Sequence, residues 1–456
     1  MNALIFSAVS GVIMMFSGFV LKTKAAVRSL AQVLLLIIVV VTAMELRGIT
    51  FFNIDTTGML FFDKFALLFT LIATFSTLVF FLLSGEDIEK VGMHYGDYFA
   101  LIFFILAGVV ISSSFQSLLL LFLGIEIISI PLYVLTGSDK RSLKSNEASL
   151  KYFLMGSFST GLMLMGIALI YGATGTFSTV NMNIATGEVP VLLVTGLLLL
   201  LFSMSFKVSA APFHFWTPDV YDGAPTVFTS YMATVVKAAG FIAFMRLFSD
   251  AFRNIGSEWK LIVAIIVAAT LFIGNITAVF QQSVKRMLAY SSIAQAGFMM
   301  LAIYTLTAEA KEGLLLYVAA YSLATIGIFA VLIKMHDYTF DGFNGFAKQQ
   351  PLIAATLVIF LLSLAGIPLT AGFLSKFYML QATVAVGNTW LAIFAVLMAA
   401  VSVYYYFRLI QAMYFKEGTP AIISVSTAFK ITLVAVAAIT IILGVYPNLL
   451  LYWLYF

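Results

Sequence analysis

The sequence predicts an all-α, polytopic membrane protein. Hydrophobic residues make up 62% of its 456 residues and charged residues only 10%, whereas soluble domains are roughly 45–50% apolar. The apolar residues fall in runs of about 17–25, and a helix needs about 20 residues to cross a hydrocarbon core ~30 Å thick. No linker, low-complexity tract or soluble domain interrupts these runs. Composition and run length therefore agree on the fold class.

About fourteen apolar runs predict about fourteen transmembrane helices. The first run has no basic residue ahead of it and meets Lys22 and Lys24 only afterwards, so we expect a retained helix and not a cleaved signal. The two runs on either side of Ser113 nearly touch. The predicted helices span residues 3–21, 26–45, 59–84, 97–112, 115–137, 149–172, 190–212, 225–250, 260–281, 285–305, 312–335, 351–381, 388–414 and 427–454.

The distribution of basic residues predicts the orientation of the chain. Short loops rich in lysine and arginine stay in the cytoplasm. If the first loop is inside, the inner loops contain 14 of the 24 Lys and Arg residues and the outer loops contain six. We therefore expect both termini on the outer side of the membrane.

The composition also excludes several functions. There are no cysteines, so thiolate-held iron–sulfur clusters, cysteine zinc sites and disulfides are excluded. His94, His214 and His336 lie far apart beside predicted loops, which is a poor arrangement for haem ligation. The net charge of +4 and the lack of a basic run give no reason to expect nucleic-acid binding. We expect no cofactor or metal in this chain.

Four basic residues remain after the loops are counted, and one acidic residue falls well inside an apolar run. The four are Lys151, Lys207, Lys237 and Lys376, and the acid is Glu126. A charge at the centre of a bilayer costs roughly 3 kcal/mol on insertion scales, so such residues indicate function.

The five residues lie at different predicted depths. Glu126 and Lys237 are near the midplane, where an ion path or a purely structural ion pair would explain them. Lys151 is near the start of its helix and is also compatible with snorkelling to the interface. A buried lysine gives up its proton more readily than an exposed one, because desolvation penalises the charged form.

The sequence predicts helix breaks beside two of the lysines. Lys207 is followed by Pro212, and Lys376 is preceded by Gly366, Pro368 and Gly372 in close succession. Proline removes a backbone hydrogen bond and clashes with the preceding turn. Transporters place binding sites at broken helices. An ordinary proline kink is the alternative for either helix alone, and finding the same combination twice makes that alternative weaker.

The two breaks fall at matching places in two blocks of the sequence. Residues 97–250 and 260–414 each contain five predicted helices and are of nearly equal length. Five crossings are an odd number, so the second block enters the membrane from the opposite side. We therefore predict two inverted five-helix repeats, preceded by three N-terminal helices in residues 1–96 and followed by one helix in residues 427–456.

The residues around these positions resemble a known family, the antiporter-like membrane subunits of respiratory complex I, and among them subunit N of the NADH-quinone oxidoreductases. The resemblance covers roughly residues 58–415. Its motifs are LFLGIEIISIPLYVLTG around Glu126, EASLKYFLMGSFSTG around Lys151, FKVSAAPFHFWTPDVYDGAPT around Lys207, VVKAAGF around Lys237, QQSVKRMLAYSSIAQAGF at 281–298 and AGIPLTAGFLSKFYML around Lys376.

The resemblance implies a role for each of the five residues. Glu126 corresponds to the glutamate that pairs with the lysine of helix seven, here Lys207. Lys237 corresponds to the lysine of helix eight that continues a polar axis along the membrane plane. Lys376 corresponds to the lysine of helix twelve at the end of the pathway. Lys151 resembles a helix-six lysine of subunit N, which favours a function over snorkelling.

Two further sets of polar residues follow from the same motifs. The first set would face the axis, with helix packing as the alternative explanation; it consists of Tyr290, Ser291, Ser292 and Gln295. The second set is expected in the inner loop after helix seven with a structural or interfacial role; it consists of His214, Trp216, Asp219 and Asp222.

The resemblance implies proton translocation coupled to redox chemistry in partner subunits. FMN, iron–sulfur clusters, NADH and quinone would belong to those partners, and this chain would lie in a bacterial inner membrane beside another antiporter-like subunit and small membrane subunits. One alternative is a subunit of a multi-subunit cation/proton antiporter. A second alternative is a scaffold without transport activity, which does not explain lysines at midplane depth beside helix breaks.

Overall fold

The computed structural model describes residues 1–180, 190–250 and 258–455, and these residues are almost wholly helical. The only strand-like pairings among them are isolated bridges between single residues. The first half contains α1 (Asn2–Val20), α2 (Lys24–Leu46), α3 (Lys64–Val91), α4 (Tyr95–Ser114), α5 (Leu118–Thr136), α6 (Leu143–Thr174), α7 (Val191–Lys207), α8 (Trp216–Gly223), α9 (Thr226–Tyr231), a π-helical turn (Met232–Val236) and α10 (Lys237–Asp250). The second half contains α11 (Glu258–Val279), α12 (Val284–Thr305), α13 (Ala308–Leu332), α14 (Phe346–Gln349), α15 (Pro351–Ala365), α16 (Ala371–Ala385), α17 (Thr389–Phe415), α18 (Thr427–Val445) and α19 (Asn448–Leu451).

Several helices begin at a capping side chain that the sequence supplies. A side-chain oxygen at this position accepts a hydrogen bond from an otherwise unpaired amide of the first turn. The residues that do so are Thr23, Asp63, Ser142, Thr307 and Ser426. These caps fix where the long apolar runs become helical.

Twelve helical segments in the described part of the chain are long and apolar enough to cross a membrane. Two shorter apolar helices, α7 and α15, each end at a break in the backbone. Each is followed by a further helix, α8 and α16 respectively. The all-α membrane fold is therefore confirmed, while the count of fourteen crossings stays a prediction.

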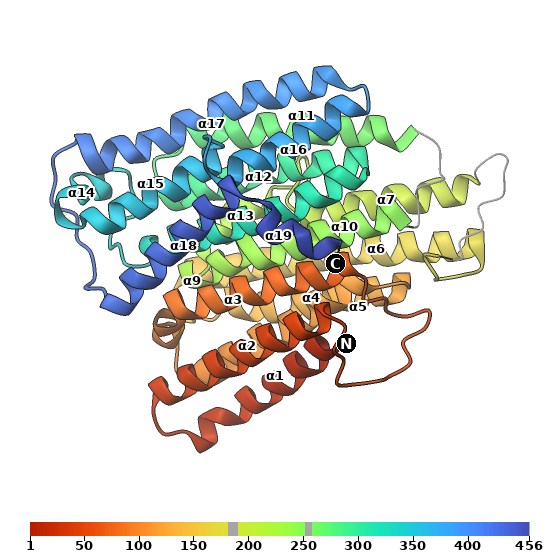
Figure 1. The fold of residues 1–456 in the computed structure, drawn as a ribbon, viewed down its shortest axis with the longest axis horizontal. Coiled ribbons are helices and arrows are strands. Elements are labelled where there is room, and N and C mark those ends of the chain that lie inside the picture. The colour runs from red at the N-terminus through yellow and green to blue at the C-terminus, as the bar shows by residue number, and fades with distance from the viewer. Residues whose placement is uncertain (181–189, 251–257, 456) are drawn as a thin grey trace.

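The helices run roughly along one direction, and the chain progresses across the bundle from α1 and α2 at one edge to α17 at the other (Figure 1). α13 lies at the centre, with nearly all of its side chains buried. Both termini lie toward the same end of the helices (Figure 1). A chain that crosses a membrane an even number of times begins and ends on the same side, so this placement fits an even number of crossings.

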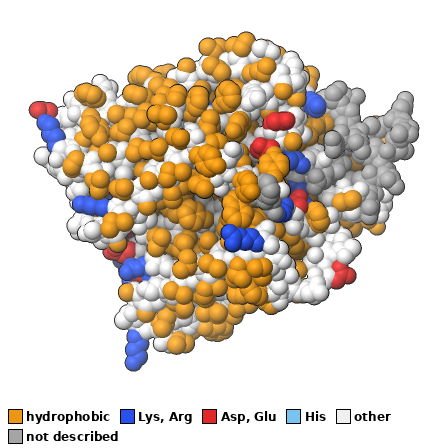
Figure 2. Space-filling view, viewed as in Figure 1, with side chains coloured by type: hydrophobic (Ala, Val, Ile, Leu, Met, Phe, Trp, Pro, Cys, Tyr) orange, Lys and Arg blue, Asp and Glu red, His pale blue; other side chains and the backbone are white. Residues whose placement is uncertain are grey.

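Hydrophobic side chains cover the middle of the face seen in Figure 2, and charged side chains lie mainly toward its two ends. Phe16 on α1, Leu397 on α17 and Ile431 on α18 are more than half exposed. Such a belt is stable in hydrocarbon and would be costly in water.

Both predicted helix breaks are present. The run predicted at 190–212 ends as a helix at Lys207, and α8 begins at Trp216. The run predicted at 351–381 divides into α15 and α16. One prediction was wrong in detail: the inner loop expected after helix seven is partly the short helix α8, because Trp216–Gly223 resumes helical hydrogen bonding after the break.

The two halves of the chain pack in matching ways. α4 packs on α5 as α11 packs on α12. α6 contacts both α7 and α8, just as α13 contacts both α15 and α16. These contacts are of the kind that two repeats would make, and the inverted relation between them stays a prediction.

Candidate functional site

The first break holds a carboxylate and a lysine close together. The Lys207 ammonium is 3.7 Å from Oε1 of Glu126, and the two side chains are only 10% and 20% exposed. Two hydroxyls lie within hydrogen-bond distance of the ammonium, that of Ser129 at 3.1 Å and that of Thr160 at 3.2 Å. Thr160 in turn donates to Glu126 at 2.7 Å. A threonine hydroxyl therefore bridges the ion pair.

Three helices supply this cluster, and local sequence explains how. Glu126 and Ser129 are three residues apart on α5 and so share one face of that helix. Thr160 comes from the middle of α6. Lys207 is the last residue of α7, so its ammonium lies at the negative end of the helix dipole.

The backbone of the first break is held by a tryptophan. Nε1 of Trp216 donates to the carbonyl of Phe206 at 3.1 Å, which satisfies one acceptor at the end of α7. Ser209 in the break has φ +64°, in the left-handed region that a non-glycine residue adopts only at a conformational cost. Such backbone is stable at membrane depth only inside protein or beside a wet cavity.

Lys237 is buried in the middle of the bundle. It is 2% exposed and follows the π-helical turn Met232–Val236, a feature that occurs frequently at functional sites. Its ammonium donates to the hydroxyl of Ser292 at 2.9 Å and to the carbonyl of the same residue at 3.1 Å. It also lies 5.6 Å from the ring centroid of Tyr221 on α8. Lys237, on α10, thus contacts both α8, the short helix after the first break, and α12.

One face of α12 connects Lys237 to the second break. Ser292, Gln295 and Phe298 follow at intervals of three residues and therefore share this face. The amide of Gln295 donates to the carbonyl of Leu364 at 2.9 Å, and Leu364 also accepts from Lys376 at 2.7 Å. A single carbonyl oxygen therefore contacts both groups.

Two tyrosines complete the hydrogen bonds around Gln295. The hydroxyl of Tyr317 on α13 donates to its amide oxygen. The hydroxyl of Tyr406 on α17 accepts from its amide nitrogen at 3.1 Å and is also hydrogen-bonded to Ser291. All of these side chains are buried. The amide is therefore fixed in one orientation.

The second break holds its lysine with backbone carbonyls. The Lys376 ammonium donates to the carbonyls of Leu364 and Ala365, at 2.7 and 3.1 Å, and these are the last two residues of α15. It lies 4.7 Å from the ring centroid of Phe298. No carboxylate of the described residues pairs with it.

Two glycines explain why this break can form. Gly366 has φ +84°, and an added Cβ there would lie 2.9 Å from Cδ of Lys376. At Gly372 an added Cβ would lie 1.9 Å from the carbonyl oxygen of Ser363, so only glycine lets α16 approach α15. The glycines that predicted the break are thus required by conformation and by space.

The structure places the interior row, Glu126, Lys207, Lys237 and Lys376, largely inside the bundle, whereas Lys151 lies at the surface. The Lys151 side chain is 41% exposed and pairs with Glu147 at 2.7 Å and with Asp219 at 2.9 Å. Asp219 also pairs with Arg286 on α12 at 3.2 Å. Lys151 therefore belongs to an ion-pair cluster around α8.

The other predicted polar residues divide into two kinds. Ser291, Ser292 and Gln295 are buried and take part in the row, whereas Tyr290 is only partly buried. Around α8, the ring of Trp216 stacks on Tyr152 and the ring of His214 stacks on Phe215. The carbonyl of Asp222 accepts from Lys285. These contacts are of the structural kind that was expected.

Sequence reasoning missed several buried charged groups. Lys285 and Lys334, which the loop count assigned to inner loops, are 4% and 5% exposed, and Arg246, assigned to an outer loop, is 4% exposed. Asp87 is buried as well. These residues lie at or near helix ends, which look like loops in the sequence but are covered by neighbouring helices.

The hydroxyl groups around Lys207 and Gln295 were also missed. Ser129 had a detectable signal, since it lies one turn from Glu126, but Thr160 and the tyrosines Tyr317 and Tyr406 had none. Among the described residues, no group of three or more His, Cys, Asp or Glu is placed to hold a metal ion. The row offers proton-binding groups and hydrogen-bonding groups in the protein interior, which suits proton transfer.

The chain is similar to proteins of a known family. Residues 115–402, which include both breaks, match the family described as NADH:quinone oxidoreductase/Mrp antiporter, transmembrane. A relative from Cytophaga hutchinsonii, NADH-quinone oxidoreductase subunit N, is 39% identical, and the alignment covers 99% of each chain. The chain belongs to the subunit N family of the NADH-quinone oxidoreductases. The resemblance predicted from its motifs is thereby confirmed.

Solved structures of two membrane complexes contain chains with a similar fold. It resembles a chain of respiratory complex I from Thermus thermophilus at 32% identity, with a TM-score of 0.84 and coverage of 99% of this chain and 98% of that chain. A chain of the Mrp complex from Dietzia has a TM-score of 0.87 at 18% identity, covering 99% and 95% of the two chains. The second likeness shows the fold alone.

Proposed function

We propose that the chain is the proton-translocating membrane subunit of an NADH:quinone oxidoreductase and that Glu126, Lys207, Lys237 and Lys376 carry the proton. The observation that supports this most is the Glu126–Lys207 pair at 3.7 Å beside a helix break. Membership of the subunit N family supports the same function.

In the first half, the Glu126 carboxylate controls whether Lys207 holds a proton. At an effective dielectric of about 20, unit charges ~4 Å apart attract by about 4 kcal/mol. A carboxylate held close keeps Lys207 charged, and its withdrawal releases the proton. The broken backbone at Ser209 and the bridging hydroxyl of Thr160 allow such a movement without exposing either charge to lipid.

In the second half, the proton passes from Lys237 toward Lys376 along α12. Ser292 contacts the first lysine and Gln295 shares an acceptor with the second. Gln295 itself has no titratable group. A proton therefore crosses this part of the row through water or through the hydroxyls of Tyr317 and Tyr406, and Lys376 releases it.

The surroundings of the chain belong to the same proposal. NADH, FMN, iron–sulfur clusters and quinone reside in partner subunits, and the neighbours are another antiporter-like subunit and small membrane subunits. The complex lies in a bacterial inner membrane with both termini of this chain outside. Residues 97–250 and 260–414 form the two inverted repeats. Lys151, paired with Asp219 of α8, supports the inner end of the path.

The proposal is tested with Lys207→Ala in the intact complex. We expect NADH-driven proton uptake by membrane vesicles to be abolished while assembly, followed on native gels, persists. The matched control is Lys348→Ala, since Lys348 is 71% exposed and lies outside the row. Normal pumping in the Lys207→Ala variant would contradict the proposal.

The alternative of a cation/proton antiporter subunit is separated by purification. Isolation of the tagged chain in mild detergent should recover flavin and iron–sulfur subunits with NADH-oxidising activity. Recovery of small membrane subunits without redox cofactors, together with sodium-dependent exchange in vesicles, would favour the antiporter. The likeness to the Mrp complex concerns fold alone and does not favour it.

A further inference from the structure

A cavity of about 770 Å³ opens between the ends of several helices. Its wall comes from the end of α3, the start of α4, the first residue of α2 and the loop between α5 and α6. Five basic or potentially basic side chains line it, and two acidic ones do. The basic residues are Lys24, Lys90, His94, Lys140 and Arg141, and the acidic ones are Glu89 and Asp139.

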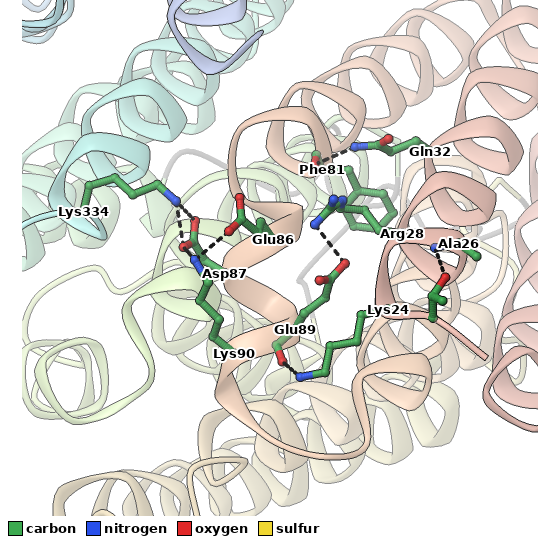
Figure 3. Close-up of polar contacts among 11 residues, drawn as sticks. Lys24, Ala26, Arg28, Gln32, Phe81, Glu86, Asp87, Glu89, Lys90 and Lys334 are labelled. Carbon is green, nitrogen blue, oxygen red and sulfur yellow. Dashed lines mark hydrogen bonds and ion pairs between the residues drawn. The ribbon is translucent and has the colours of Figure 1, made fainter. Parts of the chain in front are cut away.

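Part of this charge is already paired within the protein (Figure 3). Lys90 contacts Glu86 at 2.9 Å and Asp87 at 3.6 Å, and Asp87 is bound by Lys334 at 2.6 Å. Glu89 is paired with Arg28 of α2 at 3.1 Å. Two charged residues of the cavity wall, Glu89 and Lys90, are therefore neutralised by other side chains of the protein.

The remaining positive charge has too few acidic partners. The Lys24 ammonium donates to the carbonyl of Glu89 at 3.0 Å and lies 5.4 Å from the ring centroid of Tyr95. No carboxylate of the described residues lies within ion-pair distance of it. Lys140 and Arg141 are exposed and form no ion pair within the described residues. These three cations face the single carboxylate of Asp139, so the cavity attracts an anion.

The first turn of α4 adds to the same attraction. His94, which precedes this 20-residue helix, makes no capping hydrogen bond with its side chain. The positive end of the helix dipole lies at the cavity wall beside Tyr95, and Asp97 in the same turn pairs with His94 at 3.7 Å.

Apolar side chains next to the cavity indicate the kind of anion. Met93 lines it and is 89% exposed, and Leu143 at the start of α6 is 84% exposed. The end of α1, where Phe19 is 88% exposed, lies against the start of α4. Helices that cross a membrane end at the level of the lipid headgroups. An anion bound here would therefore have hydrocarbon chains beside exposed apolar side chains.

We propose that this cavity binds the phosphodiester headgroup of an anionic phospholipid. Lys24, Lys140 and Arg141 bind the phosphate, and Met93 and Leu143 contact the acyl chains. Basic pockets between transmembrane helices suit such headgroups. The cavity also reaches Pro225, next to Ala224, whose carbonyl accepts from Lys285 at 2.8 Å. A bound headgroup thus supports the turn between α8 and α9.

The test uses photoactivatable phosphatidylglycerol in native membranes that contain the intact complex. Adducts are mapped by mass spectrometry, and we expect them on residues 90–98 and 138–144. In the double variant Lys140→Gln with Arg141→Gln they should fall at least about tenfold, since each basic side chain near an anionic surface contributes about a fivefold factor. A photoactivatable phosphatidylethanolamine should give weaker labelling.

The control removes two charges from the same end of the molecule. Lys348 and Lys416 are 71% and 50% exposed and do not line the cavity, so Lys348→Gln with Lys416→Gln should leave the labelling unchanged. The exchange Lys140→Arg with Arg141→Lys should retain it.

Three outcomes would overturn the proposal. The first is equal labelling in the Lys140→Gln, Arg141→Gln variant. The second is complete competition by inorganic phosphate, which would identify a site for a free anion. The third is cross-linking of an acidic segment of a neighbouring subunit to these residues with no lipid adduct, which would identify a protein contact.

Discussion

The two broken helices hold their lysines in opposite ways. At the first break, Lys207 lies at the end of the first half-helix and faces a carboxylate and two hydroxyls. At the second break, Lys376 lies on the second half-helix and contacts two backbone carbonyls at the end of the first. One lysine has a partner that carries a full charge, and the other has backbone dipoles and the ring of Phe298.

This difference separates two tasks. A mobile carboxylate changes the proton affinity of Lys207 by a large step, because a unit charge is added or removed. Backbone carbonyls at a helix end carry only partial charges and do not move away without breaking α15. The first break is therefore suited to switching a proton on and off, and the second to holding and releasing it at a steady affinity.

The largest expected effect comes from overpacking the second break at Gly372. Gly372→Val would place a Cβ 1.9 Å from the carbonyl oxygen of Ser363, so α15 and α16 cannot keep their contact. Overpacking of this kind costs about 1–3 kcal/mol or more. We expect much less folded chain in membranes and a lower melting temperature. Gly161→Val on α6, where nothing lies within 4 Å, is the control, and equal losses in both variants would refute the explanation.

A smaller effect, confined to pumping, is expected at Lys376. Lys376→Met removes the proton carrier, and Lys376→Arg keeps the charge beside Leu364 and Ala365 but does not release a proton. Both variants should lower NADH-driven pumping to about a tenth or less of the normal rate, and each tenfold step corresponds to about 1.4 kcal/mol. Only the methionine variant leaves the two carbonyls unpaired. Pumping by the arginine variant at the normal rate would show that Lys376 acts only as a structural cap.

Glu126→Gln tests the switch at the first break. The glutamine still accepts from Thr160 but lacks the charge, so Lys207 loses its partner and the two breaks become alike. We expect pumping to fall about tenfold, equivalent to about 1.4 kcal/mol, with assembly retained. Glu417→Gln is the control, because Glu417 is 93% exposed and its pair with Lys348 is a surface pair.

The smallest expected effect concerns the bridging hydroxyl. Thr160→Val keeps the shape of the side chain but removes hydrogen bonds to both Glu126 and Lys207. A loss of about 1 kcal/mol, or about fivefold in pumping rate, is expected. Thr195→Val, on the exposed side of α7, should have no effect. A larger loss than that of Glu126→Gln would mean that the hydroxyl itself carries the proton.

Much of the fold could be predicted because its signals are local. Runs of apolar residues gave the helices, and Gly366, Pro368 and Gly372 gave the second break. Four of the five predicted ionisable residues lie in the interior because they fall far inside apolar runs, where a charged side chain cannot reach water. The sequence alone shows this position. Lys151 differs because it is close enough to a helix end to do so.

The site could be predicted only in part. Sequence placed Lys207 beside a break, but not the hydroxyl of Thr160, which comes from a helix 47 residues away. Nor did it reveal that Lys334, in the turn after α13, is buried against Asp87 of α3, since the two residues are 247 positions apart. Ser129 is the exception, because its spacing of three residues from Glu126 places it on the same helical face.

By itself, the sequence determined that this protein crosses the membrane many times, where two of its helices break and which charges those helices carry inward. These properties depend on the solubility of side chains in hydrocarbon and on the backbone chemistry of proline and glycine, both of which are local. Only the tertiary structure decided which partner each lysine has, a carboxylate for Lys207 and backbone carbonyls for Lys376. That choice depends on which faces of distant helices pack together, and no local pattern contains it.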